Sequence, residues 1–577
     1  MSGVNREESI RNRFAISVVL AALVAGIFAF AQSYRRWLDP FVDAGRDLYI
    51  PEQLSLGTTL YRDILYFYPP LTPYLLAAIT ALTGSSLNSY IAIGLVIALL
   101  TAAAIWSIVK PLAGSIAAGC ALLIFFAFSM AGIGGWGCNY FFPYAHAATL
   151  AMLFFLGAVA FLTRGRWVLA MLLLVAASWT KIEFAAFSVV ILAVQMFGAQ
   201  AFTLSSRASS EGPGRVGGSR LALRTARPPR SLATLGMTAA GLFVLLNLVV
   251  LAIAIASFGL EPLRANVLPP SLLGGASARA FYAQVTGTAA WRQNLILAAR
   301  GAALLAAFVA LLYAWDRRPR FRFAIVVAVA VVAFALANDT FFRAWTILQV
   351  VLIPFALRKP REPLTLLLVA SLCASSRIAL NIAPSWYGFV FITPVVVLMV
   401  YVFFEWLPQR GVYARTTAVA WLLPFALVAT SGLLAARAAY ARAEPVSTKR
   451  GTYEDTNGGR AQAVTALLQH LERAGARDLA VMPEGLAINY LSRLRTPLRH
   501  QTFTPVEIAG EEASIVAELE ARPPQYVALV PRDVREFGYR GFGIDYGREI
   551  VVWLKTHYTV EARFGPIVLL RYRQPAQ

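Results

Sequence analysis

The sequence predicts a mainly α-helical membrane protein, a polytopic bundle of about thirteen transmembrane helices with a small C-terminal α/β domain. Three observations predict this fold class. The chain of 577 residues is 58% hydrophobic and only 14% charged, whereas soluble proteins carry about 25% charged residues. Apolar runs such as "FAISVVLAALVAGIFAFA" at 14–31 recur along the chain, and roughly 20 apolar residues cross a bilayer as a helix. After residue 440 helical and strand patterns alternate instead.

Apolar length, interrupted by charge, predicts the individual spans. Several are short, so that one or two could be merged or re-entrant. The predicted helices lie at about 14–32, 88–109, 112–131, 144–162, 167–178, 184–202, 235–256, 294–314, 321–337, 341–357, 363–381, 387–406 and 413–436.

The distribution of positive charge predicts an orientation with a cytoplasmic N-terminus. The segments that alternation then places inside hold about twenty Lys and Arg residues, against roughly nine outside, as the positive-inside rule expects. This orientation divides the chain into a transmembrane domain, 1–440, and an extracytoplasmic domain, 441–577. The apolar run at 14–31 follows "NREESIRNR" and no small-residue cleavage site follows it, which favours a retained first helix over a removed signal peptide.

Two segments differ in composition from the spans: 203–233 and the C-terminal tail, which comprises residues 441–577. Ser, Gly, Pro and Arg dominate 203–233, which predicts a disordered cytoplasmic loop. In the tail, "GRAQAVTALLQHLERAG", "EEASIVAELEARP" and "GREIVVWLKTHY" predict helices, whereas "DLAVMP", "QYVALVP" and "GPIVLLRYR" predict strands. Such alternation indicates a partly parallel sheet. No phosphate-binding glycine motif is present, so we assign the tail no nucleotide and the chain no cofactor.

The placement of charge, cysteine and histidine argues against nucleic acid binding, a disulfide framework and a metal site. The net charge of +21 is spread over short segments between apolar runs, without the basic face that nucleic acid binding requires. The three cysteines lie in or beside apolar runs without paired spacing, and the four histidines are scattered. Neither a disulfide framework nor a metal site is predicted.

The first predicted outer loop, 33–87, is unusually polar for this chain. It contains Asp39, Asp43, Asp47 and Asp63 among four arginines, followed by a Pro-Pro-Leu step. These charges could neutralise one another in a structural loop, because ion-pair networks also resemble functional sites. Alternatively, one carboxylate faces a cavity as a general base, and nearby arginines hold a phosphate.

The order "DAGRDLYIPEQLSLGTTLYRDILYFYPPLTPYLLA" resembles the first extracytoplasmic loop of GT-C membrane glycosyltransferases, especially the bacterial branch of protein O-mannosyltransferases and aminoarabinose transferases. The matching positions are Asp43, Arg46, Gly57, Tyr61, Asp63, Pro69, Pro70 and Leu71. The resemblance implies an enzyme of the bacterial cytoplasmic membrane with Asp43 as catalytic base. It also implies a polyprenyl-phosphate sugar donor and a glycan, lipid or protein acceptor.

The donor phosphate would need cations, and three charged residues at predicted outer helix ends are candidates: Lys181, Arg343 and Arg377. Each could instead be a long side chain that reaches the interface. Trp386 and Tyr387 could stack on sugar or belong to an interfacial aromatic belt.

The chain departs from the family in its second outer loop, "GIGGWGCNYFFPYAH", which has Asn139 but no carboxylate. Some GT-C enzymes carry a metal-associated acidic cluster there. Its absence favours the metal-independent, lipid-monophosphate branch and argues against an oligosaccharyltransferase. Arg46, Asp63 and Asn139 are then weaker candidates for orienting substrate.

Two other function classes stay open. A transporter or lipid flippase would more typically show carboxylates in the middle of its spans and duplicated halves, and the sequence shows neither. A non-catalytic scaffold that displays the tail would not require the Asp–Arg–Pro-Pro-Leu order.

Overall fold

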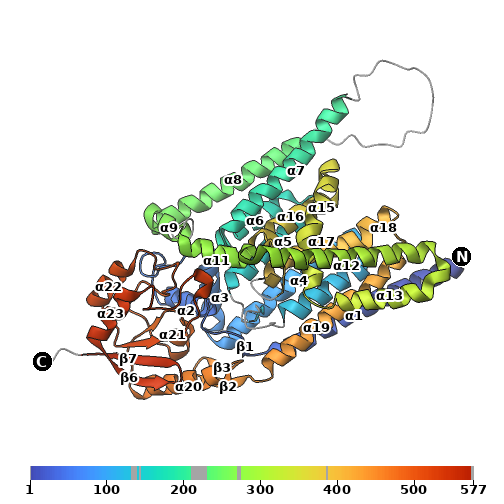
Figure 1. Ribbon diagram of the computed structural model, residues 1–577. Coiled ribbons are helices and arrows are strands. Elements are labelled where there is room, and N and C mark those ends of the chain that lie inside the picture. The colour runs from blue at the N-terminus through green and yellow to red at the C-terminus, as the bar shows by residue number, and fades with distance from the viewer. Residues whose placement is uncertain are drawn as a thin grey trace.

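The computed structural model describes residues 2–130, 139–141, 145–208, 231–269, 275–384 and 388–573. A bundle of long helices forms most of the molecule, and the C-terminal α/β part packs against one end of it (Figure 1). The N-terminus lies at the opposite end of the bundle. The fold class predicted from composition and apolar length is confirmed.

Each predicted span is helical over all or most of its described residues. The predicted spans 88–109 and 112–131 both lie within α4, which consists of two helices joined at a kink, since Gly114 leaves the helical conformation (φ 86°, ψ 173°). The principal helices of the bundle are α1 (Ser2–Ser33), α4 (Leu87–Ser129), α5 (His146–Leu162), α6 (Trp167–Thr180), α7 (Glu183–Ala208), α8 (Ser231–Phe258), α12 (Trp291–Arg317), α13 (Arg322–Ala335), α14 (Thr340–Arg343), α15 (Trp345–Arg358), α16 (Pro363–Ser375), α17 (Gly388–Tyr401), α18 (Leu407–Gln409) and α19 (Leu422–Tyr440). Most of the predicted disordered loop, residues 209–230, lies outside the described residues.

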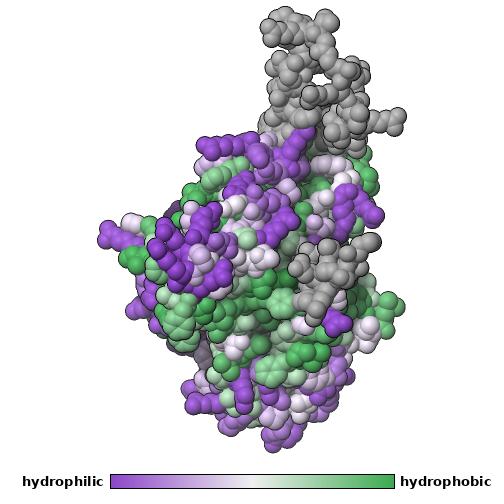
Figure 2. Space-filling view, turned by 90° about the vertical axis from the view of Figure 1, so that its right-hand side faces the viewer, coloured by the Kyte–Doolittle hydropathy of each residue, from purple (hydrophilic) through white to green (hydrophobic). Residues whose placement is uncertain are grey.

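Seven helices in the described part of the chain are long and apolar enough to cross a membrane. They are exposed to different degrees. In Phe389–Gln409, 89% of the most apolar 18-residue stretch is buried, whereas in Thr238–Phe258 only 17% of the corresponding stretch is buried. Buried apolar helices form the centre of the bundle, whereas exposed apolar helices require lipid around them. The face shown in Figure 2 correspondingly carries a broad hydrophobic area between hydrophilic patches. The chain is a multi-pass membrane protein.

The first outer loop contains ordered structure of its own. It forms β1 (Arg36–Trp37), α2 (Ala44–Ser55) and α3 (Leu71–Thr83), the last directly after the two prolines. The later segment near the same end of the bundle contains α9 (Leu260–Val267) and α11 (Ala276–Thr286).

The tail folds around a four-stranded sheet in the order β4-β5-β7-β6. The strands β4 (Leu479–Met482) and β5 (Tyr526–Leu529) are parallel, whereas β5 and β6 (Tyr558–Phe564) both run antiparallel to β7 (Ile567–Tyr572). The helices are α20 (Gly458–Arg473), α21 (Ala487–Ser492), α22 (Glu512–Ala521) and α23 (Arg548–His557). The predicted partly parallel sheet is therefore present, and β6 is a strand of this sheet that the sequence pattern does not predict.

The first loop and the tail are built into one another. The loop strand β1 pairs with β3 (Gly451–Asp455), which also pairs with β2 (Glu444–Thr448). Helix α2 approaches α21 so closely that a Cβ on Gly45 would lie 2.1 Å from the backbone nitrogen of Ala487. The tail consequently fixes the position of α2. The division into two domains at residue 440 stays a prediction.

Candidate active site

A cavity of about 190 Å³ lies where the first loop, several helix ends and the tail meet. Its walls come from segments that the charge pattern predicts to lie on the same side of the membrane. Which membrane face this is stays a prediction. The charged residues that line the cavity are Asp43, Arg46, Lys181, Glu183, Arg377, Glu484, Glu507, Arg532 and Glu536.

Asp43 occupies an uncommon backbone conformation at the start of α2. Its φ of 52° and ψ of −46°, with a hydrogen bond from the Ala44 N–H to the Val42 carbonyl, form a γ-turn of the rare positive-φ kind. Such a conformation costs about 1–3 kcal/mol and persists only where its surroundings hold it. The Asp43 side chain is 12% exposed and forms an ion pair with Arg46, one helical turn along α2.

Arg46 connects Asp43 to other walls of the cavity. Its Nη1 donates to Glu507 Oε1 at 3.1 Å, and its guanidinium lies 5.1 Å from the centre of the Tyr68 ring. Burial alone would lower the pKa of Arg46, but Tyr68 and Glu507 outweigh it and raise that pKa above its ordinary value. Arg46 therefore stays charged, and it is shared between two carboxylates.

A second charged group lies at the helix ends on the bundle side of the cavity. Lys181 ends α6, and its Nζ lies 3.0 Å from Glu183 Oε1 in the first turn of α7. The Nη1 of Arg377, which follows α16, lies 2.7 Å from the same oxygen. One carboxylate therefore faces two cations, and this group carries one excess positive charge.

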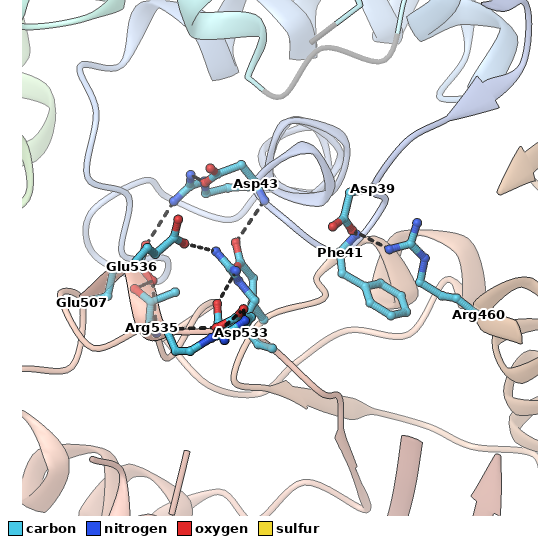
Figure 3. Close-up of polar contacts among 12 residues, drawn as sticks. Asp39, Phe41, Asp43, Arg460, Glu507, Asp533, Arg535 and Glu536 are labelled. Atoms are coloured by element: carbon cyan, nitrogen blue, oxygen red, sulfur yellow. Dashed lines mark hydrogen bonds and ion pairs between the residues drawn. The ribbon is translucent and has the colours of Figure 1, made fainter. Parts of the chain in front are cut away.

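The tail supplies a third charged group. Glu484 follows β4, and its Oε2 accepts from Arg532 Nε at 2.8 Å. Arg532 follows β5 and also contacts Glu536 Oε1 at 2.5 Å. Burial raises the pKa of Glu536, although Arg532 opposes this effect. For Arg532 the two glutamates outweigh burial, and its pKa rises. Figure 3 shows Asp43 of the first loop beside tail segments that carry Glu507 and Glu536.

Tyr68 joins the two sides of the cavity. The Arg46 guanidinium and the Lys181 ammonium each lie 5.1 Å from the centre of its ring. Cations at this distance are attracted by the ring quadrupole. An unbroken series of contacts thus leads from Asp43 through Arg46, Tyr68 and Lys181 to Glu183.

Two aspartates of the first loop have structural partners instead. Asp39 Oδ1 lies 3.0 Å from Arg460 Nη1 of the tail, as Figure 3 shows. Asp47 is buried against His146, accepting from its backbone N–H, with the ring Nδ1 3.5 Å away. Of the four loop aspartates, Asp43 alone lines the cavity, and its role as a base stays a prediction.

Three other predicted site residues, Asp63, Asn139 and Arg343, do not line this cavity. Asp63 forms an exposed ion pair with Arg62 at 2.9 Å. Buried Asn139 donates to the Tyr440 hydroxyl at 3.3 Å. Arg343 pairs with Asp339 at 2.6 Å. Tyr387 and Trp386 lie outside the described residues. The cavity brings together Asp43, Arg46, Lys181 and Arg377.

Sequence reasoning missed the acidic partners and the tail residues. One signal for the tail was present: "DLAVMPE" and "QYVALVPR" each place a charged residue directly after a strand and a proline, at Glu484 and Arg532. The carboxyl ends of parallel strands meet at one edge of a sheet, where ligands commonly bind. Glu183 was signalled only by its proximity to Lys181. No pattern connects Glu507 or Glu536 to Asp43.

The described residues contain no group of three or more His, Cys, Asp or Glu side chains placed to hold a metal ion. The cavity instead offers cations to an anionic ligand and carboxylates to hydroxyl groups.

No protein-family model and no curated protein matches the sequence. Among solved structures, the apo oligosaccharyltransferase of Archaeoglobus fulgidus aligns over 93% of this chain and 71% of its own, with 12% identity and a TM-score of 0.45.

Proposed function

We propose that this protein is a membrane glycosyltransferase that transfers a sugar from a polyprenyl-phosphate donor to a glycan, lipid or protein acceptor. The reaction would take place at the extracytoplasmic face. The observation that carries the proposal is the cavity in which the first-loop carboxylate Asp43 lies with the cations Lys181 and Arg377. The resemblance of the first loop to GT-C enzymes supplies the reaction class.

The bundle side of the cavity suits the donor phosphate. Lys181, Arg377 and Glu183 together carry one positive charge, which matches the single negative charge of a polyprenyl-phosphate sugar diester. When the sugar leaves, the phosphate gains a second negative charge. Cations already in place stabilise that charge as it develops, and an Arg side chain binds two phosphate oxygens at once. Apolar Ile182, Val267 and Leu268 line the same cavity and suit an isoprenoid chain.

The loop side suits the acceptor. The Asp43 carboxylate would accept the proton of the acceptor hydroxyl as its oxygen attacks the anomeric carbon. The bond from that carbon to the phosphate oxygen breaks, and its electron pair leaves with polyprenyl phosphate. A single displacement of this kind inverts the anomeric centre. Arg46 orients Asp43, while Glu507 shares the charge of Arg46 and so weakens its hold on the carboxylate.

The experiment is a comparison of cellular lipids and envelope glycans by mass spectrometry in wild type, a deletion strain, and the deletion strain carrying Asp43→Asn. We expect a polyprenyl-phosphate sugar to accumulate in the deletion strain while one glycan loses that sugar, and Asn to fail to restore it. Full rescue by Asn would contradict the role of Asp43. A lipid-linked sugar that stays on the cytoplasmic leaflet would indicate a flippase instead.

A further inference from the structure

We propose that Glu484 of the tail is a positioning residue that holds Asp43 in its reactive conformation, with Arg532 as its anchor. This inference rests on the proposed function. It assigns the tail a part in the transfer step itself, through one side chain that joins two distant segments of the chain.

The contact with Asp43 is made at the strained point of the loop. Glu484 Oε1 accepts the backbone N–H of Asp43 at 3.0 Å. That N–H belongs to the central residue of the γ-turn. A strained turn of this kind persists only where contacts with the surrounding structure hold it. A hydrogen bond from a backbone N–H to a carboxylate contributes more than one between neutral groups. Glu484 therefore stabilises the backbone conformation that directs the Asp43 side chain into the cavity.

Glu484 is itself fixed from the other side. Its second carboxylate oxygen, Oε2, binds Arg532 Nε at 2.8 Å, and the two side chains are only 5% and 8% exposed. Glu536 holds Arg532 in turn. Both Glu484 and Arg532 directly follow strand–proline steps at the carboxyl ends of the parallel strands β4 and β5, so the sheet sets their spacing.

The surrounding packing makes this contact rigid. Gly45, two residues after Asp43, lies against the backbone of Leu486 and Ala487, two and three residues after Glu484. Two short segments, 43–46 and 484–487, are therefore in contact in two ways: their backbones pack together at Gly45, and the Glu484 side chain binds the Asp43 backbone. A displacement of the tail by about 1 Å would be transmitted to Asp43, and such misplacement can cost about 100-fold in rate.

Two variants of Glu484 separate positioning from simple loss of charge. Glu484→Gln keeps an oxygen that accepts the Asp43 N–H but loses the charge that binds Arg532. Glu484→Ala loses both contacts. Glu472→Ala is a matched control, because Glu472 lies in an exposed tail ion pair with Lys449.

The test combines two measurements on the full-length protein in nanodiscs. The first is hydrogen–deuterium exchange at the Asp43 amide. We expect faster exchange in Glu484→Ala, a smaller increase in Glu484→Gln, and no change in Glu472→Ala. The second is transfer from the polyprenyl-phosphate sugar that the deletion strain accumulates. We expect kcat to fall about 10- to 100-fold in Glu484→Ala, with the KM for donor near wild type, a Tm that is lowered by the loss of the buried ion pair but stays above the assay temperature, and an intermediate kcat in Glu484→Gln.

Three results would overturn the inference: unchanged exchange in Glu484→Ala, faster exchange with unchanged kcat, or a fall in Tm that accounts for the whole loss. Failure of the proposed function is read from a different sample, because unmodified protein would then transfer no sugar. The exchange measurement would still decide whether Glu484 holds Asp43.

Discussion

The bundle side and the loop–tail side of the cavity carry similar charged groups in opposite proportions. On the bundle side Glu183 faces two cations, Lys181 and Arg377. On the loop–tail side four carboxylates face two guanidinium groups: Asp43, Glu484, Glu507 and Glu536 against Arg46 and Arg532. The excess positive charge suits a lipid phosphate, and the excess carboxylate suits hydroxyl groups. Under the proposed function, this polarity would place an anionic donor and a hydroxyl acceptor at opposite sides of one cavity.

The largest expected effect comes from replacing Asp43, the reactive carboxylate on the loop–tail side. Asp43→Asn should lower transfer by about 100-fold or more, because an amide cannot accept the proton that general base catalysis removes. Its folding should be nearly unchanged, since Asn also tolerates positive φ. Turnover and Tm of the purified variant check both statements. Normal turnover would remove Asp43 from the mechanism.

On the bundle side, Arg377→Ala should raise the KM for the lipid donor by about 10-fold or more, because a charged hydrogen bond to phosphate contributes about 1.5–3 kcal/mol. Arg343→Ala is the matched control, since Arg343 pairs with Asp339 and does not line the cavity. Initial rates over a range of donor concentrations measure both. Equal effects of the two variants would contradict the placement of the phosphate.

Gly45→Ala tests the packing that joins the loop to the tail. The added Cβ would lie 2.1 Å from a backbone nitrogen, and overpacking of this kind costs about 1–3 kcal/mol. This exceeds the gain of about 1 kcal/mol in helix propensity, so the Tm should fall. Gly459→Ala, whose Cβ would lie 3.6 Å from its nearest neighbour, should leave the Tm unchanged or raised. Thermal unfolding followed by intrinsic fluorescence compares them.

The smallest expected effect concerns Asp63, which carries the same charge in the same loop but lies outside the cavity. The hydrogen bond from Arg62 lowers the pKa of the Asp63 carboxyl to about 2. Because this pKa is lower in the folded state than its ordinary value near 4, the ionised carboxylate stabilises the folded protein at pH values above about 4. This stabilisation is lost as the pH falls towards 2. Asp63→Asn should therefore lower the Tm slightly at pH 7, less so at high salt, and leave transfer intact.

The difference between the two sides also explains what could be predicted from sequence. Lys181 and Arg377 stand out because a cation at the end of an apolar helix is rare, and Asp43 stands out through the order of the loop motif. The contacts of Glu484 with the Asp43 backbone and of Glu507 with Arg46 could not be predicted, because they depend on the packing of α2 against tail segments about 440 residues away. Helices were predictable from apolar length, whereas the two-residue strand β1 exists only by pairing with β3.

Equilibrium binding of polyprenyl phosphate tests most directly whether the two sides of the cavity have different ligands, because this product lipid can be used before the sugar is identified. The protein in nanodiscs is titrated with the lipid as wild type, Lys181→Ala and Asp43→Asn. We predict that wild type and Asp43→Asn bind the lipid with similar Kd. The Kd of Lys181→Ala should be about 10-fold higher or more. Equal affinity of all three proteins, or a loss of affinity confined to Asp43→Asn, would contradict the placement of the lipid phosphate on the bundle side.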